Sequence, residues 1–181
     1  MGTLNSLYIR VPDESVAAAV RAAYPSAYTE PATTFYAVRQ PDQLFRCPES
    51  ELQSLSARLD TDVIWLSFQS AVDAFQYHHW VGGNHLRSLV YGCFDREREW
   101  ERADGQSEEW ERIVLFDADE LARLLKYCDS DEQRQNLARV YREQKVTPGS
   151  SEPSLEARET ARGVAKFYRF PGWGLADGSG G

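Results

Sequence analysis

The sequence predicts an α+β fold with a mostly antiparallel sheet. The stretch 63–94 reads as three consecutive strands, rich in β-branched and aromatic residues. The last two are joined by Gly82-Gly83, a strong hairpin signal because glycine adopts the positive φ angles of two-residue turns. Segments with helical spacing of apolar residues lie before and after this centre. We therefore expect an N-terminal β-α-β unit, helices covering one face, and C-terminal helices that complete the core.

The N-terminal third predicts strands and helices in alternation. Asp13 is a candidate N-cap for the first helix, and Pro48 followed by acidic residues indicates the start of the second. Leu52, Leu55 and Leu59 share one face of that second helix. The expected elements are strands at 7–11 and 33–39 and helices at 13–23 and 48–59.

The register of the central hairpin decides which side chains are buried. If Gly82 and Gly83 are the two turn residues, Trp80 lies opposite His85, and side chains alternate between the faces with period two. A shift by one residue would exchange the faces. The face expected in the core carries Phe75, Tyr77, His79, Leu86, Ser88 and Val90. The other face, which is solvent-exposed, covered by a helix or used for binding, carries Gln76, His78, Trp80, His85, Arg87, Leu89 and Tyr91.

A highly charged segment follows residue 94, and the tripeptide Trp-Glu-Arg occurs in it twice, starting at Trp100 and Trp110. Asp104-Gly105 lies between the two copies, so we expect a second hairpin with an Asp-Gly turn. The alternative is a charged helix. Residues 113–116 are expected to end the β half of the chain.

The C-terminal third predicts helices. Asp117 and Ser130 are expected N-caps, the latter with Gln133 in a capping box. Residues 146–153 read as a linker, a last helix ends before Phe170, and Trp173 is expected to fold back onto the body. We expect one domain over 1–175, helical over about 117–170, and a flexible tail at 176–181.

Composition excludes several classes of function. The net charge of −8 and the pI near 4.9 argue against nucleic acid and anionic membranes as partners. No apolar run approaches the roughly 20 residues of a membrane span, and the N-terminus does not resemble a signal peptide. Cys47, Cys93 and Cys128 are odd in number and widely spaced, which fits reduced thiols in a cytoplasmic protein.

No segment carries a recognised catalytic motif. His78, His79 and His85 lack the partners of a zinc site, so we expect no metal and no cofactor, and we assign no catalytic residue. Asp73 is expected to be a strand-end or bulge residue whose carboxylate bonds nearby amides. Arg87 pairs either with a ligand carboxylate or, as we expect, with a glutamate of the charged segment.

Aromatic residues set among charges are typical of protein-binding surfaces. The alternative is that the same rings close the open face of the sheet against the C-terminal helices. For the binding interpretation, acidic residues around the rings would favour a basic partner. The candidate binding residues are His78, Trp80, Arg87, Tyr91, Trp100 and Trp110.

The pattern Asp73-x-Phe75-x-Tyr77, followed by Trp80 and Leu86-Arg87-Ser88-Leu89, resembles the central hairpin of an uncharacterised bacterial α+β family. The resemblance covers about residues 63–116 and implies no activity. Small size and acidity also resemble immunity proteins of bacterial toxin systems, by analogy only. We expect a cytosolic bacterial protein-binding module, with an immunity-like role as one form of it. The alternative is a small enzyme or ligand-binding domain with a pocket near Asp73, His78 and Arg87.

Overall fold

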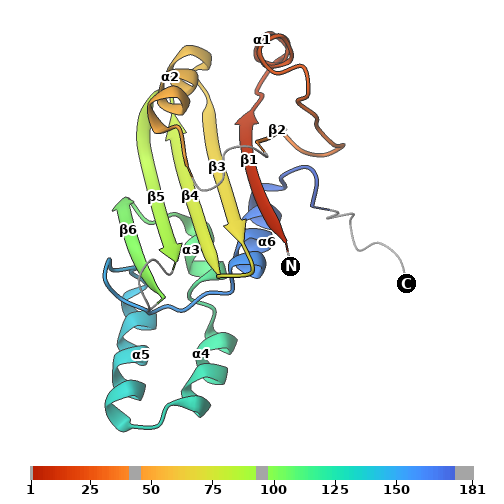
Figure 1. The fold of residues 1–181 in the computed structure, drawn as a ribbon. Helices are drawn as coiled ribbons and strands as arrows, with labels where there is room; N and C mark the ends of the chain where they lie inside the picture. Colours follow the sequence, from red (N-terminus) through yellow and green to blue (C-terminus); the bar gives the residue numbers. More distant parts are fainter. Residues whose placement is uncertain (1, 41–45, 93–97, 174–181) are drawn as a thin grey trace, which may run out of the picture.

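The computed structural model describes residues 2–40, 46–92 and 98–173, which form a six-stranded antiparallel sheet and the helices around it (Figure 1). The order of the strands is β2-β1-β3-β4-β5-β6. The strands are β1 Thr3–Arg10, β2 Phe35–Arg39, β3 Asp62–Gln69, β4 Ala74–Val81, β5 Asn84–Gly92 and β6 Glu99–Gly105. The helices are α1 Glu14–Ala23, α2 Glu49–Leu59, α3 Glu109–Val114, α4 Ala118–Leu124, α5 Asp131–Glu143 and α6 Ala157–Tyr168, with a 3₁₀ turn η1 at Leu125–Tyr127.

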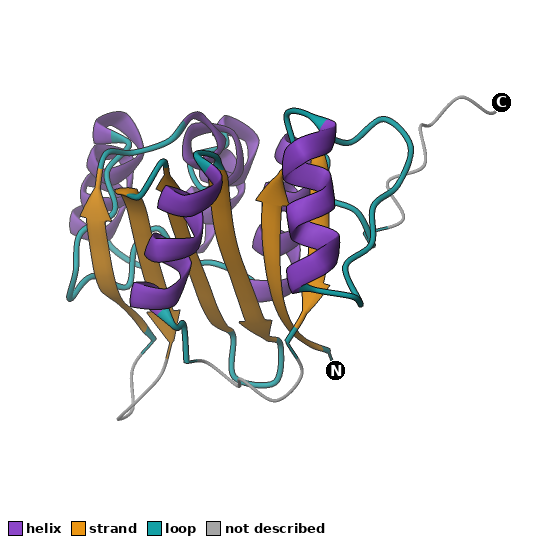
Figure 2. Ribbon diagram, turned by 90° about the horizontal axis from the view of Figure 1, so that it is seen from above, coloured by secondary structure: helices purple, strands orange, loops and turns teal. Residues whose placement is uncertain are grey.

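The expected α+β class is confirmed, and the chain begins with the expected β1-α1-β2 unit. Helices lie on both sides of the sheet (Figure 2). One face packs against α1 and α2 in a cluster that includes Leu7, Trp65 and Trp80. The C-terminal helices complete a larger core on the other face, where Tyr77 and Leu89 are fully buried. Alternation along the strands thus supplies a core to each side.

Polar caps fix the helix starts, as the sequence predicts. Asp13 accepts a hydrogen bond from the Val16 amide at 2.9 Å, which caps α1. Asp117 accepts bonds from two amides of α4. Ser130 and Gln133 form the expected capping box of α5. These local interactions involve neighbours in the chain, so they could be read from the sequence.

The register of the central hairpin differs from the expected one in β5. Trp80 does pair with His85, but the ladder shifts between His79 and Trp80, so His79 opposes Arg87. This irregularity places one additional residue in β5, as in a β-bulge. The face assignments of β4 are therefore correct, and those of β5 beyond Leu86 are exchanged. Arg87, Leu89 and Tyr91 share the face of Phe75 and Tyr77, and the expected core residue Val90, which is only partly buried, lies opposite Gln76.

The prediction of a second hairpin is wrong. Strand β6 runs through Asp104 to Gly105, and the second Trp-Glu-Arg copy lies in helix α3, together with Ile113 and Val114. A capping box between Glu108 and Glu111 starts this helix. Gly105 has a φ of +86°, and a Cβ there would lie 1.9 Å from the carbonyl oxygen of Leu86. This glycine therefore permits close approach of β5 and β6 rather than a hairpin turn.

The C-terminal segment returns to the sheet as expected. Trp173 Nε1 donates a hydrogen bond to the Tyr8 hydroxyl at 2.8 Å. Helix α6 packs on β3 and β4 beneath this contact. Cys93, Phe94 and the predicted tail at 176–181 lie outside the described residues, and the single-domain assignment stays a prediction. Within the described part of the chain, no helix is long and apolar enough to span a membrane.

Candidate functional site: an acidic cleft at one end of the sheet

The prediction that the tryptophans form an exposed binding surface is wrong. The exposed fractions of Trp80, Trp100 and Trp110 are 2%, 0% and 0%. Trp100 Nε1 donates to the Pro153 carbonyl oxygen at 2.9 Å, and Trp110 packs on the ring of Tyr77 at a centroid distance of 5.0 Å. The alternative interpretation, in which the rings close the sheet against other parts of the chain, is the one that the geometry matches.

Asp73, His78 and Arg87 do not share a pocket. His78 lies on the α2 face, where its ring stacks on Trp80 and its Nδ1 is 2.9 Å from the Ser88 hydroxyl. Arg87 lies on the opposite face, because it pairs in register with His79. Asp73 precedes β4 at the far end of the strand, where its carboxylate contacts Arg98 at 2.5 Å. It is thus a strand-end residue, as expected, but its partner is a guanidinium rather than the expected amides.

Arg87 binds a glutamate of the charged segment, as the sequence indicates. Its Nε and Nη2 donate to the two carboxylate oxygens of Glu111 at 2.8 and 2.7 Å. The exposed fractions of the two side chains are 3% and 1%. Nη1 also donates to the carbonyl oxygens of Asp104 and Gly105. The guanidinium therefore joins β5, the end of β6 and α3, and it does not face a ligand.

A second buried ionic group surrounds His79 at the same end of the sheet. Its Nδ1 contacts Glu108 at 2.6 Å and its Nε2 contacts Asp62 at 3.1 Å. Burial opposes the imidazolium, but hydrogen bonds to both carboxylates outweigh burial and raise the pKa of His79. Glu108 also accepts bonds from the hydroxyls of Tyr77 and Tyr168. Because these carboxylate oxygens are occupied by groups of the protein, we interpret this network as structural.

A large cavity lies at the opposite end of the sheet. It is a cleft of about 930 Å³ between the strand ends near Asp73 and Tyr91 and the helices α4, α5 and α6. Figure 1 shows α4 and α5 beyond this end of the strands. Leu115 and Leu155 form an apolar part of the cleft wall, and Tyr141 of α5 also lines the cleft. The side chains come from six separate parts of the described chain, brought together by the return of α6 to the sheet.

Carboxylates dominate the charge of this cleft. Among the described residues, its two guanidiniums belong to Arg98 and Arg123, and each contacts a carboxylate of the cleft: Arg98 contacts Asp73, and Arg123 contacts Glu120 with two nitrogens, at 2.7 and 2.5 Å. The hydrogen bonds from Arg123 lower the pKa of Glu120. The six carboxylates that line the cleft belong to Asp73, Asp117, Asp119, Glu120, Glu156 and Glu159.

Acidic residues at helix starts have a structural explanation, which must be weighed. Asp117, Asp119 and Glu120 belong to the start of α4, and Glu156 and Glu159 to the start of α6, where the helix dipole favours negative charge. Two such helix ends together supply roughly one positive charge. The excess of carboxylates over guanidiniums is larger than this, so the cleft stays negative. Asp119, Glu156 and Glu159 have no ion-pair partner among the described residues.

Two tyrosines form the inner wall. Burial raises the pKa of Tyr91, and burial together with Glu120 and other carboxylates raises the pKa of Tyr141 to about 12, so both hydroxyls are neutral at pH 7. Tyr91 also packs on Trp100, with ring centroids 5.0 Å apart. Glu152 acts electrostatically on both tyrosines from behind the wall.

Of the six binding residues expected from sequence, only Tyr91 lines the cleft; His78, Trp80, Arg87, Trp100 and Trp110 do not. Sequence reasoning missed Tyr141 and the acidic starts of α4 and α6. Two acidic capping segments, 117–120 and 156–159, are visible in the sequence, but the sheet and α6 must be placed before they are seen to meet.

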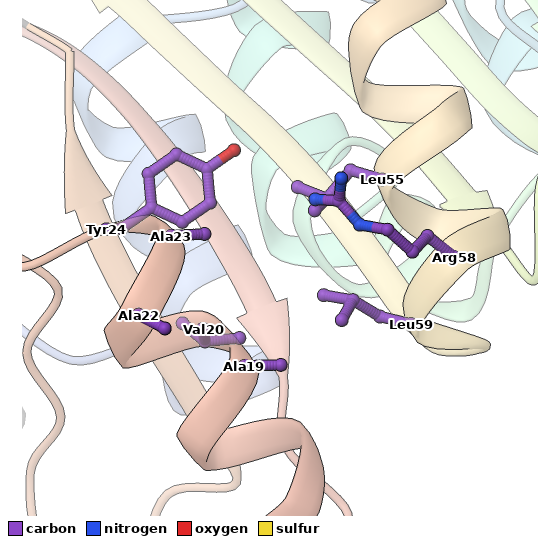
Figure 3. A pocket seen from close by; sticks show the side chains of 8 residues that line it. All are labelled: Ala19, Val20, Ala22, Ala23, Tyr24, Leu55, Arg58 and Leu59. Atoms are coloured by element: carbon purple, nitrogen blue, oxygen red, sulfur yellow. The ribbon is translucent and has the colours of Figure 1, made fainter.

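A second hollow, of about 310 Å³, lies between α1 and α2 (Figure 3). Figure 3 shows the small residues of α1, such as Ala19 and Ala23, facing Leu55, Arg58 and Leu59 of α2 across it. Nothing in the described chain indicates an occupant, and we assign it no function.

Comparison of the chain with protein-family models, with curated proteins and with solved structures gives no match. The resemblance to a bacterial family therefore stays a prediction. No group of three or more His, Cys, Asp or Glu side chains suited to a metal ion occurs in residues 2–40, 46–92 and 98–173. The cleft is thus assigned from its own geometry.

Proposed function

We propose that the protein is a non-catalytic binding module that takes a basic segment of another protein into the acidic cleft. The observation that carries the proposal is the charge of the cleft: six carboxylates, two guanidiniums that already contact two of them, and a volume of about 930 Å³. A cavity of this size accepts several side chains of an extended segment.

The chemistry of the cleft favours recognition over catalysis. Among the described residues, no serine or cysteine nucleophile with a histidine base lines it, and its tyrosine hydroxyls stay protonated at neutral pH. Apolar wall from Leu115 and Leu155 beside carboxylates suits lysine or arginine, whose long stems pack on apolar surface while the charged head meets an acid. The immunity-like role depends on the identity of the partner and stays a prediction.

The proposal is tested by isothermal titration with a basic probe, acetyl-hexa-arginine amide, at low and at physiological ionic strength. We expect binding that weakens with salt, because the Debye length falls to about 8 Å at 0.15 M. The test variant Asp119→Asn/Glu159→Gln removes two cleft charges that lack ion-pair partners within the described chain. It should weaken binding by about 2- to 30-fold, since exposed charge pairs each contribute about 0.2–1 kcal/mol.

A matched control separates a site from the effect of net charge. Glu51→Gln/Glu132→Gln removes the same charge from exposed positions on α2 and α5 that do not line the cleft. The control should bind as the unmodified protein does. Equal weakening in both double variants, or no binding at low salt, would contradict the proposal.

A further inference from the structure

Tyr141 is a cleft residue whose ring is held in place and whose hydroxyl has no hydrogen-bond partner among the described residues. Its side chain is only 5% exposed, and its ring packs edge-on against Phe116 at a centroid distance of 5.7 Å. It lines the cleft, and its hydroxyl makes no hydrogen bond to any residue in the described ranges. A hydroxyl on a cleft wall that no group of the described chain binds can accept a hydrogen bond from a donor of a bound ligand.

Carboxylates surround this hydroxyl. Glu120, Glu152 and Asp117 each act on it electrostatically, opposed by Arg123 alone among the strongest contributors. Burial raises the pKa of Glu152, whose Oε2 accepts a bond from the Ser154 amide at 3.0 Å. No cation among the described residues pairs with Glu152. Asp117 lines the cleft together with Tyr141 and has no ion-pair partner among the described residues. A hydroxyl that can accept and a carboxylate in one cleft are suited to a cationic donor.

We propose that Tyr141 and Asp117, which both line the cleft, form a subsite for the guanidinium group of one arginine of the partner. The inference rests on the proposed function and specifies which side chain anchors the segment. A guanidinium presents five N–H donors in one plane, so it can donate to the hydroxyl and to a carboxylate at once. The ammonium of lysine is a compact, strongly hydrated charge and matches such a divided set less well.

The cleft already contains one guanidinium that is bound to a carboxylate. Arg123 bridges both oxygens of Glu120 with Nε and Nη2. Both side chains of that pair are partly exposed, with exposed fractions of 60% and 41%. The partner's arginine would therefore lie next to a pair of the same chemistry.

The test compares Tyr141→Phe with the unmodified protein, using acetyl-hexa-arginine amide and acetyl-hexa-lysine amide as probes. The substitution removes the hydroxyl and keeps the ring that packs on Phe116. Affinity for the arginine probe should fall about tenfold, the usual effect of losing one hydrogen bond to a charged group. Affinity for the lysine probe should change less than twofold. Tyr127→Phe, at a tyrosine that is 74% exposed and outside the cleft, is the control and should change neither.

Asp117→Asn is a second, independent variant, because the asparagine oxygen can still accept the bonds from the Asp119 and Glu120 amides. This variant should weaken binding of the arginine probe and change the melting temperature by no more than a few degrees. If the arginine probe binds, and Asp119→Asn/Glu159→Gln weakens it while Tyr141→Phe does not, the subsite is refuted and the proposed function stands. Equal losses for both probes in Tyr141→Phe refute the preference for guanidinium. Failure of the probe to bind the unmodified protein refutes both proposals.

Discussion

Replacing Glu111 with glutamine should destabilise the protein strongly, although the side chain keeps its shape. Glu111 and Arg87 form a two-pronged pair at 2.8 and 2.7 Å, with exposed fractions of 1% and 3%. Glu111→Gln leaves the guanidinium buried beside a neutral amide. It also turns an amide donor towards a guanidinium donor, since glutamine has only one oxygen.

The magnitude follows from burial. Breaking a buried pair by removing one partner costs about 3–5 kcal/mol, because the other charge is left uncompensated. Here two carbonyl oxygens at the end of β6 also accept hydrogen bonds from Nη1 of the guanidinium, at 3.3 and 3.2 Å. They compensate part of its charge. Glu111 also bonds the Glu108 amide at 2.8 Å, and glutamine can replace that bond. We therefore expect a loss near the lower limit, about 3 kcal/mol.

The assay is urea unfolding followed by tryptophan fluorescence, since Trp100 and Trp110 are fully buried. The control is Glu143→Gln, whose pair with Arg139 is exposed on both sides and should be worth less than about 1 kcal/mol. The double variant Arg87→Met/Glu111→Leu should recover most of the loss, because no charge is left unpaired. A loss below about 1 kcal/mol in Glu111→Gln would refute the structural role of this pair.

Three further predictions concern stability. The contribution of His79 to stability is measured as the unfolding free energy of the unmodified protein minus that of His79→Gln. Because the pKa of His79 is raised, this contribution is present below about pH 6.5 and decreases as the pH rises through the raised pKa. A contribution that grows towards pH 9 would contradict the network. At acidic pH the contribution of His79 to stability is lost as the pH falls through the lowered pKa of Asp62. Gly105→Ala should cost about 1–3 kcal/mol more than Gly149→Ala, because both have positive φ but only Gly105 lacks room for a Cβ; equal melting temperatures would argue against this close contact of strands. Trp100→Ala should cost about 3–5 kcal/mol as a core truncation, and a melting temperature close to that of the unmodified protein would restore the surface interpretation.

Local signals in the sequence predicted much of this fold. The helix caps at Asp13, Asp117 and Ser130 and the Gly82-Gly83 turn depend on residues close in the chain, and each occurs where expected. The irregularity beside His79 could not be read in the same way, because two glycines fit a regular two-residue turn equally well. It is set by the pairing of two strands along their length.

The two Trp-Glu-Arg copies show where pattern reasoning fails. Identical tripeptides lie in a strand at Trp100 and in a helix at Trp110, because tertiary packing outweighs local propensity. Asp-Gly at 104–105 has the composition of a hairpin turn, but here the glycine serves a close contact with Leu86. The acidic cleft was hidden for a related reason: its carboxylates are separated in sequence and meet only through the packing of α4 and α6.

The most direct test of the binding proposal is mapping the contact surface of acetyl-hexa-arginine amide by ¹H–¹⁵N NMR on the full chain at low ionic strength. Binding in the acidic cleft predicts backbone shifts that cluster around Asp119, Tyr141 and Glu159 and disappear at high salt. Shifts centred instead on the hollow between α1 and α2, spread evenly over the acidic surface, or absent altogether would contradict it.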